Sequence, residues 1–221
     1  MAGQDLNYPQ ELPVCEHREE ILAALRTHPV VIVCGDTGSG KTTQLPKMAL
    51  EIGIRDQGSG IRKNGERHTR IAVTQPRRLA AVTMAERVAE ELKCEVGGLV
   101  GFRHRFGRKV SSDTRIEFMT DGVLLAETRF DPLLRAYDTI IVDEAHERSL
   151  NIDFLLGILK RILERRRDLK VIVSSATLDA ARFSEFFGDA PVISVPGRLY
   201  PIEIGYRPPP EDEERALPRA V

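Results

Sequence analysis

Residues 35–42 carry the chemistry that is easiest to read in this sequence. They spell GDTGSGKT and fit the pattern G-x-x-x-x-G-K-[ST] of a phosphate-binding loop. Glycines let the backbone turn tightly, so that successive N–H groups can point at phosphate oxygens. We expect Lys41 to reach the β- and γ-phosphates and the Thr42 hydroxyl to bind Mg²⁺. The candidate nucleotide-binding residues in this segment are Gly38, Ser39, Gly40, Lys41, Thr42 and Thr43.

The alternative for this segment is a glycine turn that matches the pattern by chance. An apolar run precedes it and a helix-compatible stretch, TQLPKMALEI, follows it. A phosphate loop needs this order of strand, loop and helix, because the positive end of the helix then faces the phosphates. The context therefore favours a nucleotide site.

Asp143 and Glu144 are the second candidate pair, and they follow the apolar run at 139–142. Ligands of open α/β sheets lie beyond the carboxyl ends of the strands. An aspartate there can hold Mg²⁺, and a following glutamate can polarise an attacking water. The alternative is a solvated acidic turn at the start of a helix. Because Lys41 is predicted at the same edge of the sheet, we expect a shared site with Thr42, Asp143 and Glu144 around the metal.

The elements that must position these residues alternate along the chain. Short runs rich in β-branched residues predict buried strands at 30–34, 71–74, 139–142, 170–174 and 191–195. Stretches with helical spacing of apolar residues lie at 17–26, 79–92, 154–162 and 183–187. This alternation predicts an α/β fold with a doubly wound, mostly parallel sheet and helices on both faces.

Segments without such periodicity suggest the domain limits. Residues 55–69 are polar and glycine-rich and predict a surface loop, and residues 207–221 are proline-rich and then acidic, as in a linker. We expect a lead-in at 1–15, one nucleotide-binding domain at 16–206, and a linker or tail at 207–221.

Composition excludes some classes of protein. The 221 residues have a formal net charge of −1, so a nucleic-acid surface would have to come from local clustering of basic residues. The three cysteines show no CxxC spacing, which favours a reducing compartment over a disulfide framework or a zinc site. No signal pattern and no apolar run near the roughly 20 residues of a membrane helix is present. We expect a cytoplasmic monomer with no membrane association.

Further motifs follow the phosphate loop in a recognisable order. Residues 74–81 read TQPRRLAA, 120–122 read TDG, 143–146 read DEAH, and 175–177 read SAT. Over residues 10–206 the chain resembles the first RecA-like domain of DEAH-box helicases of superfamily 2, most closely the bacterial HrpA-type RNA helicases. The resemblance implies a RecA-like P-loop NTPase fold, ATP and Mg²⁺ as cofactors, and RNA-dependent NTP hydrolysis coupled to strand translocation and unwinding. The implied partner is single-stranded RNA, with DNA possible.

The resemblance also implies catalytic roles. Lys41, Asp143, Glu144 and His146 match catalytic positions, and His146 would tie its motif to Ser175 and Thr177 and so couple nucleotide state to domain movement. A packed or helix-capping histidine is the competing interpretation of His146. Ser175 and Thr177 could equally cap the helix that follows them.

Basic residues match the family's ligand contacts. Arg77, Arg78 and Thr120 correspond to positions on the nucleic-acid backbone, and Arg105 is a further candidate; such contacts give affinity without sequence preference. The surrounding run at 103–109, RHRFGRK, is either an RNA contact or a basic hairpin.

Two other basic features have structural alternatives. Arg87 matches an arginine that stacks on adenine, but an ion pair with Glu90 or Glu91 would explain it equally well. The run at 161–167, RILERRR, is interpreted as the exposed face of a helix.

The family's second RecA-like domain, with its arginine finger, has no counterpart in this sequence. We therefore expect the chain alone to bind nucleotide weakly and to hydrolyse it poorly. The alternatives are a P-loop NTPase of another class, a DNA-directed helicase, or a non-catalytic nucleotide-gated module. The sequence lacks an LSGGQ-like signature, and intact Lys41, Asp143 and Glu144 disfavour the non-catalytic module.

Overall fold

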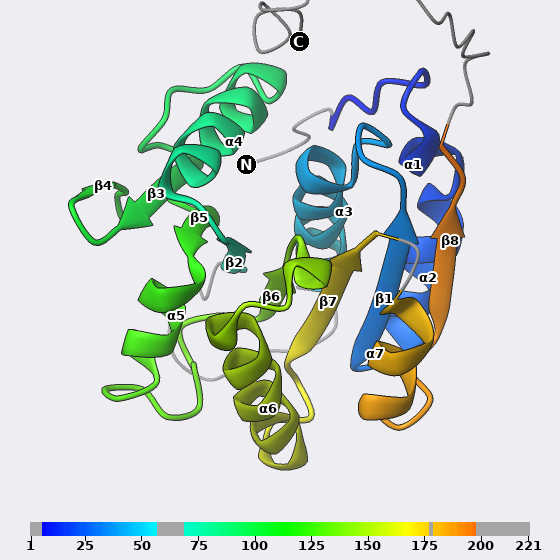
Figure 1. Ribbon diagram of the computed structural model, residues 1–221. Helices are drawn as coiled ribbons and strands as arrows, with labels where there is room; N and C mark the ends of the chain where they lie inside the picture. The colour runs from blue at the N-terminus through cyan, green and yellow to red at the C-terminus, as the bar shows by residue number, and fades with distance from the viewer. Residues whose placement is uncertain (1–5, 57–68, 177–178, 198–221) are drawn as a thin grey trace, which may run out of the picture.

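Eight strands form one sheet in the computed structural model, which describes residues 6–56, 69–176 and 179–197 (Figure 1). The sheet order is β4-β3-β5-β2-β6-β7-β1-β8, and only β3 and β4 are antiparallel neighbours. The strands are β1 (Val30–Gly35), β2 (Ile71–Gln75), β3 (Val100–His104), β4 (Gly107–Lys109), β5 (Ile116–Thr120), β6 (Thr139–Val142), β7 (Lys170–Ser175) and β8 (Val192–Val195).

Helices cover both faces of this sheet. They are α1 (Pro13–Glu16), α2 (Arg18–Thr27), α3 (Lys41–Asp56), α4 (Arg78–Glu91), α5 (Asp121–Glu127), the 3₁₀ helix η1 (Ala145–Glu147), α6 (Leu150–Arg165) and α7 (Ala180–Phe186). Side chains alternate along each strand, so Val31 packs in the core under α2, α3 and α4, whereas Val30 and Ile32 pack in the core under α6 and α7. The predicted doubly wound, mostly parallel sheet is confirmed.

The predicted strands are all present, but β3, β4 and β5 were not predicted as strands. The run in β5 is IEFMT, and its Glu117 is buried although it is charged. A charge inside a short apolar run hides the burial signal on which strand prediction depends. The hairpin interpretation of the run at 103–109 is confirmed, because β3 and β4 pair with His104 opposite Gly107.

The basic run at 161–167 is not uniformly exposed, contrary to expectation. Arg166 follows α6 and is buried, and its guanidinium donates hydrogen bonds to three main-chain oxygens in the segment 133–137. It also pairs with Asp168 at 2.8 Å. A buried arginine with these partners holds the end of α6 against the segment that leads into β6.

The expected lead-in at 1–15 is in part integrated into the fold. Val14 in α1 is fully buried and belongs to the core that also contains α2 and α3, so a boundary after residue 15 falls inside a packed helix. The tail at 207–221 and most of the loop at 55–69 lie outside the described residues. No helix in the described part of the chain is long and apolar enough to cross a bilayer.

Candidate nucleotide site and nucleic-acid face

The phosphate loop and the acidic pair lie at one edge of the sheet. Strands β1 and β6 both run parallel to β7, which separates them, so their carboxyl ends point the same way (Figure 1). The loop follows β1, and Asp143 follows β6. The charges of Asp143 and Glu144 act on the Lys41 ammonium. The structure therefore brings together the two segments that the sequence placed at a common site.

Backbone conformation of the phosphate loop depends on glycine. Gly38 and Gly40 have φ angles of +83° and +89°, in the left-handed region that favours glycine. A Cβ on Gly40 would also lie 3.0 Å from a methyl carbon of Leu12 and 3.2 Å from one of Val14. The Val14 N–H donates to the Ser39 carbonyl at 3.0 Å, so the N-terminal segment supports the loop directly.

Oxygens of this loop surround the Lys41 ammonium. Its Nζ donates to the Gly35 carbonyl at 2.7 Å, the Asp36 carbonyl at 2.8 Å and Ser39 Oγ at 3.0 Å. Burial lowers the pKa of the Lys41 ammonium, and the neighbouring carboxylates act to raise it. The predicted phosphate ligand is thus a cation held by loop oxygens, at the residue where α3 begins.

Thr42 and Thr43 occupy the first turn of α3, after Lys41. Thr43 Oγ1 donates to the Gly40 carbonyl at 3.3 Å, which closes the loop onto the helix. Both side chains are half-buried at a helix N-terminus, where the main-chain N–H groups favour anions. These positions suit phosphate and metal contacts.

Asp143 is the residue that best fits a metal ligand. It is 1% exposed, and its Oδ2 accepts a hydrogen bond from Gln75 Nε2 at 2.6 Å. Its Oδ1 is buried and has no hydrogen-bond partner among the described residues. An unpaired carboxylate oxygen is costly to bury, and it is the kind of oxygen that Mg²⁺ binds.

A complete metal cage of protein side chains is absent from the described ranges, because no cluster of three His, Cys, Asp or Glu residues could hold an ion there. Mg²⁺ is usually held by one or two carboxylates together with substrate phosphates. Sequence reasoning did not assign Gln75 a role. Its position in the TQPRRLAA motif was the available signal, but spacing alone does not show that it meets Asp143.

Glu144 is held by His146. Glu144 has a left-handed backbone (φ 52°) at the start of η1, a conformation that costs energy for a residue with a side chain. The Ala176 N–H donates to His146 Nδ1 at 3.1 Å, so the ring proton lies on Nε2 when the histidine is neutral. That Nε2 lies 3.3 Å from a Glu144 carboxylate oxygen.

The surroundings of Glu144 raise the pKa of its carboxyl above that of a free glutamate. Burial raises the pKa of Glu144, and the charge of Asp143 raises it further. His146 and Lys41 act in the opposite direction. The carboxylate therefore lies between a negative neighbour and two groups that stabilise its charge.

His146 also connects the DEAH motif with the SAT motif through its bond from Ala176. Ser175 is buried, and its hydroxyl donates to the Ala176 carbonyl at 3.0 Å. Ser175 is the last residue of β7, and helix α7 begins at Ala180 with Asp179 as its N-cap. Thr177 lies outside the described residues.

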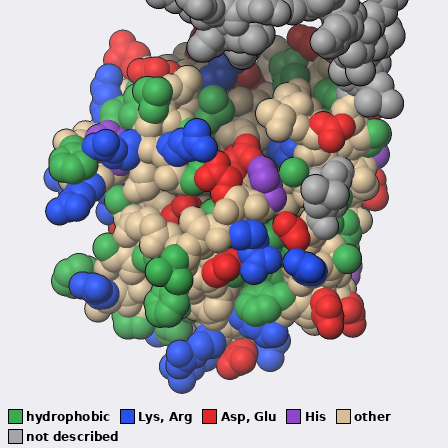
Figure 2. All heavy atoms as spheres, in the orientation of Figure 1, with side chains coloured by type: hydrophobic (Ala, Val, Ile, Leu, Met, Phe, Trp, Pro, Cys, Tyr) green, Lys and Arg blue, Asp and Glu red, His purple; other side chains and the backbone are tan. Residues whose placement is uncertain are grey.

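The predicted nucleic-acid residues gather at a second place on the same edge of the sheet. Arg78, Arg105 and Thr120 line one cavity of about 830 Å³, although they come from α4, the β3–β4 hairpin and the end of β5. The Arg78 guanidinium lies 4.8 Å from the centroid of the Phe106 ring, and that of Arg105 lies 5.6 Å from it. Figure 2 shows Lys and Arg side chains gathered on the hairpin side of this face.

Arg77 is not among the residues that line this cavity, although its neighbours Pro76 and Arg78 are, and its side chain contacts Glu147 instead. It is 78% exposed and pairs with Glu147 at 3.4 Å. An exposed pair of this kind contributes little to stability and can be exchanged for another anion.

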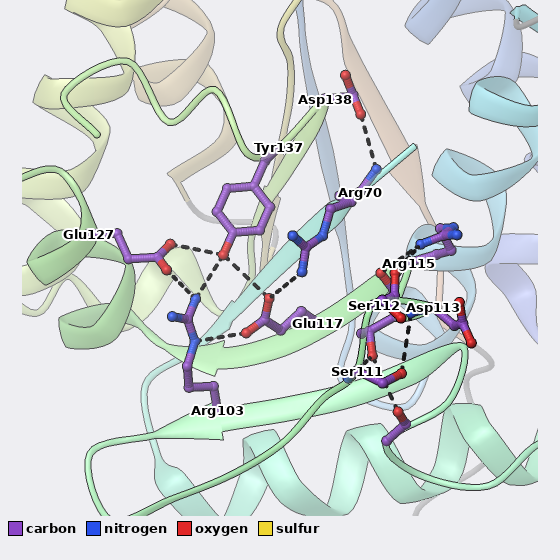
Figure 3. Close-up of polar contacts among 12 residues, drawn as sticks. Arg70, Arg103, Ser111, Ser112, Asp113, Arg115, Glu117, Glu127, Tyr137 and Asp138 are labelled. Carbon is purple, nitrogen blue, oxygen red and sulfur yellow. Dashed lines mark hydrogen bonds and ion pairs between the residues drawn. The ribbon is translucent and has the colours of Figure 1, made fainter. Parts of the chain in front are cut away.

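Arg103 also lines this cavity, but acidic partners neutralise its guanidinium, so the run at 103–109 does not form one uniformly basic surface. Its side chain forms ion pairs with Glu117 at 2.8 Å and with Glu127, and it donates to the Tyr137 hydroxyl at 2.8 Å (Figure 3). These partners come from β5, α5 and the segment before β6. Arg103 therefore anchors the hairpin, and Arg105 and Arg108 remain exposed.

Arg87 forms ion pairs with Glu90 and Glu91, as the alternative to an adenine contact predicts. Its guanidinium lies 3.3 Å from Glu90 and 3.1 Å from Glu91 on the same face of α4. The adenine contact implied by the resemblance stays a prediction, and the ion pairs decide where the guanidinium lies.

Comparison with known proteins agrees with this arrangement. The family model for DEAD/DEAH box helicases matches residues 16–186. The chain is 55% identical to the ATP-dependent RNA helicase HrpA of Escherichia coli over 96% of its own length and 16% of that protein. It is 51% identical to the HrpA homolog of Haemophilus influenzae, over 94% of the chain and 15% of that protein. It is 48% identical to HrpA of Borreliella burgdorferi, over 90% of the chain and 23% of that protein.

The chain thus spans between about one-seventh and one-quarter of the length of these relatives. The family match covers the phosphate loop, the acidic pair and the cavity lined by Arg78, Arg105 and Thr120, all on an α/β sheet of RecA-like form. The chain belongs to the DEAD/DEAH box helicase family.

Proposed function

We propose that this chain is the first RecA-like motor domain of an ATP-dependent RNA helicase, which couples hydrolysis of a Mg²⁺-bound NTP to movement along single-stranded RNA. The observation that carries the proposal is the shared edge of the sheet, where Lys41 and the buried, unpaired Oδ1 of Asp143 belong to one electrostatic site. The names of the relatives support RNA as the substrate.

In the proposed reaction the chain's own residues bind and orient the triphosphate. The loop N–H groups of Gly38, Ser39 and Gly40 and the Lys41 ammonium bind the phosphates, and Thr42 and Asp143 hold Mg²⁺, which neutralises phosphate charge. Glu144 orients the attacking water and accepts its proton. Phosphoryl transfer depends mainly on positioning and charge compensation, and the site supplies both.

Coupling between the nucleotide and the rest of the protein is proposed to pass through His146. This side chain bonds Glu144 with one ring nitrogen and the Ala176 N–H with the other, so a change at the catalytic carboxylate alters a bond at the end of β7. A nucleotide-dependent shift between two arrangements of this contact would bias domain closure. Ser175 and Thr177 flank Ala176 in the sequence.

A strand of RNA is proposed to cross the edge of the sheet at the cavity lined by Arg78, Arg105 and Thr120. Arg77, Arg78, Arg105 and the Thr120 hydroxyl are suited to phosphate oxygens, which give affinity without sequence preference. Phe106 extends between two of these arginines and offers an apolar surface to a base or sugar. The cavity lies beside the start of α4, which follows Gln75, the partner of Asp143.

The nucleotide site is tested by Lys41→Ala. Loss of charge-assisted bonds to phosphate is expected to weaken Mg-ATP binding by roughly 30- to 100-fold, measured by titration calorimetry with this chain. Lys160→Ala is the matched control, because Lys160 is exposed on α6 and contacts only the Phe186 ring in the described contacts. Equal affinities for the wild type and Lys41→Ala would contradict the proposed phosphate site.

The strand path is tested by Arg105→Ala. We expect about a five- to tenfold loss of affinity for single-stranded RNA at low salt, and a smaller dependence of the affinity on salt, since one phosphate contact is lost. A filter-binding assay with uridine and adenosine oligonucleotides should show the same loss for both. Arg161→Ala, an exposed arginine on α6, is the control.

One result of this assay would count against the strand path, and another against a preference for RNA. If Arg105→Ala bound RNA as tightly as the wild type, the cavity would not be part of the strand path. Equal binding of matched DNA oligonucleotides would favour a helicase without RNA preference.

A further inference from the structure

A buried polar cluster joins the end of α4 to the start of α3. Glu91 Oε2 accepts hydrogen bonds from Lys47 Nζ and from Gln44 Nε2, each at 2.9 Å. Lys47 and Gln44 are fully buried, and their Nζ and Nε2 donors are paired, whereas Gln44 Oε1 has no hydrogen-bond partner among the described residues. The cluster is therefore a fixed junction between the two helices.

This junction is connected to the phosphate loop. Gln44 Nε2 also donates to Thr43 Oγ1 at 2.8 Å, and Thr43 in turn bonds the Gly40 carbonyl. Lys47 donates to the main-chain oxygen of Asn7 at 2.6 Å, which belongs to the N-terminal segment that supports the loop. Through Thr43 and Asn7 the cluster therefore contacts both the phosphate loop and the N-terminal segment that packs against it.

The other end of the cluster holds Arg87. Glu91 uses its second carboxylate oxygen, Oε1, to accept from Arg87 Nε at 3.1 Å. Glu90 also contacts this guanidinium, at 3.3 Å, but its side chain is 74% exposed against 12% for Glu91. An exposed partner can move with solvent, whereas the carboxylate of Glu91 is fixed by two buried donors.

The charge state of Glu91 suits this task. Burial acts to raise the pKa of its carboxyl, but the bonds from Lys47 and Gln44 and the charge of Lys47 together lower it below the ordinary value. The carboxylate therefore stays ionised and keeps both oxygens available as acceptors at neutral pH.

We propose that Glu91 is a positioning residue, which holds the Arg87 guanidinium at the base of the bound nucleotide and keeps it in register with the phosphate loop through Gln44 and Lys47. This inference rests on the proposed function, to which it adds the contact between Arg87 and the base that the resemblance implies. Glu91 itself touches neither phosphate nor base and acts through the arginine.

The test compares two ligands that share a diphosphate. Mg-ADP carries a base and Mg-pyrophosphate does not, so the ratio of their dissociation constants isolates the contribution of adenosine. In this chain, Glu91→Gln is expected to weaken ADP binding about fivefold, the size of a lost guanidinium–ring contact, and pyrophosphate binding less than about twofold. Titration calorimetry with both ligands gives the ratio directly.

Matched variants separate positioning from a general structural effect. Glu90→Gln makes the same chemical change one residue earlier, and it should change neither constant by more than about twofold. In an Arg87→Ala background, Glu91→Gln should cause no further loss of ADP affinity, since the group that it positions is gone. An equal loss for both ligands, or a loss that persists without Arg87, would overturn the proposal.

Folding is controlled separately. Glu91→Gln leaves the buried Lys47 without a counter-charge, and such a change can destabilise a protein strongly. The double variant Lys47→Met with Glu91→Gln removes both charges and should show the same selective loss for ADP. If the wild type bound neither ligand, the proposed nucleotide site would fail before Glu91 was tested.

Discussion

Glu144→Gln is expected to lower the rate of ATP hydrolysis by about 10³-fold and to leave ATP affinity within about threefold. Glutamine keeps the shape of glutamate and can still accept the hydrogen bond from His146 Nε2, so the turn at η1 should persist. It cannot take a proton from water. The change therefore removes the proposed base and retains the geometry around it.

The measurement requires a protein that turns over. We suggest a chimaera in which this chain replaces the matching segment of the Escherichia coli relative, assayed for ATP hydrolysis with saturating single-stranded RNA. Glu164→Gln, at an exposed glutamate of α6, is the matched control and should hydrolyse ATP at the parent rate. Turnover that Glu144→Gln left unchanged would show that another group accepts the proton.

Asp143 is a poorer candidate for that base, although it is adjacent. Its Oδ2 is bonded to Gln75, and its side chain is almost completely buried, so it is fixed as an acceptor with one oxygen to spare. Glu144 is half-buried, and its carboxylate lies 3.3 Å from His146 Nε2. The two carboxylates therefore suit different tasks, metal binding for the first and water orientation for the second.

The sequence predicted those parts of the site that depend on local order. A β-branched run followed by glycines and a lysine gave β1, the phosphate loop and α3, and a second run gave β6 and the acidic pair. Parallel strands bring their carboxyl ends to one edge, so the meeting of Lys41 with Asp143 followed from the fold class.

Contacts between distant segments could not be predicted in this way. The acidic partners of Arg103, Glu117 and Glu127, lie 14 and 24 positions further along the chain, and nothing in a basic run indicates that one arginine is neutralised. Lys47 is similar, because it is fully buried between Asn7 and Glu91, which are 40 and 44 positions away. Sequence reasoning places charges at the surface by default, and only the fold identifies the exceptions.

Hydrolysis also requires positive charge around the transferred phosphoryl group. Lys41 supplies one positive charge at the site, and its three hydrogen bonds already go to loop oxygens. Arg77 contacts Glu147, and Arg78 contacts the Phe106 ring. The charge that develops on the transferred phosphoryl group therefore needs a further cation, which the family's second RecA-like domain is proposed to supply as an arginine finger.

Joining the chain to such a domain is expected to raise ATP turnover by about 10³- to 10⁵-fold, the contribution of an arginine finger. Steady-state hydrolysis is compared between the isolated chain and the chimaera, both with single-stranded RNA. Adding Glu144→Gln to the chimaera should remove the increase, because the gain requires an intact site in this domain. If the isolated chain hydrolysed ATP as fast as the chimaera under RNA stimulation, the missing cation would have to come from within this chain, and the proposed division of catalysis between two domains would be wrong.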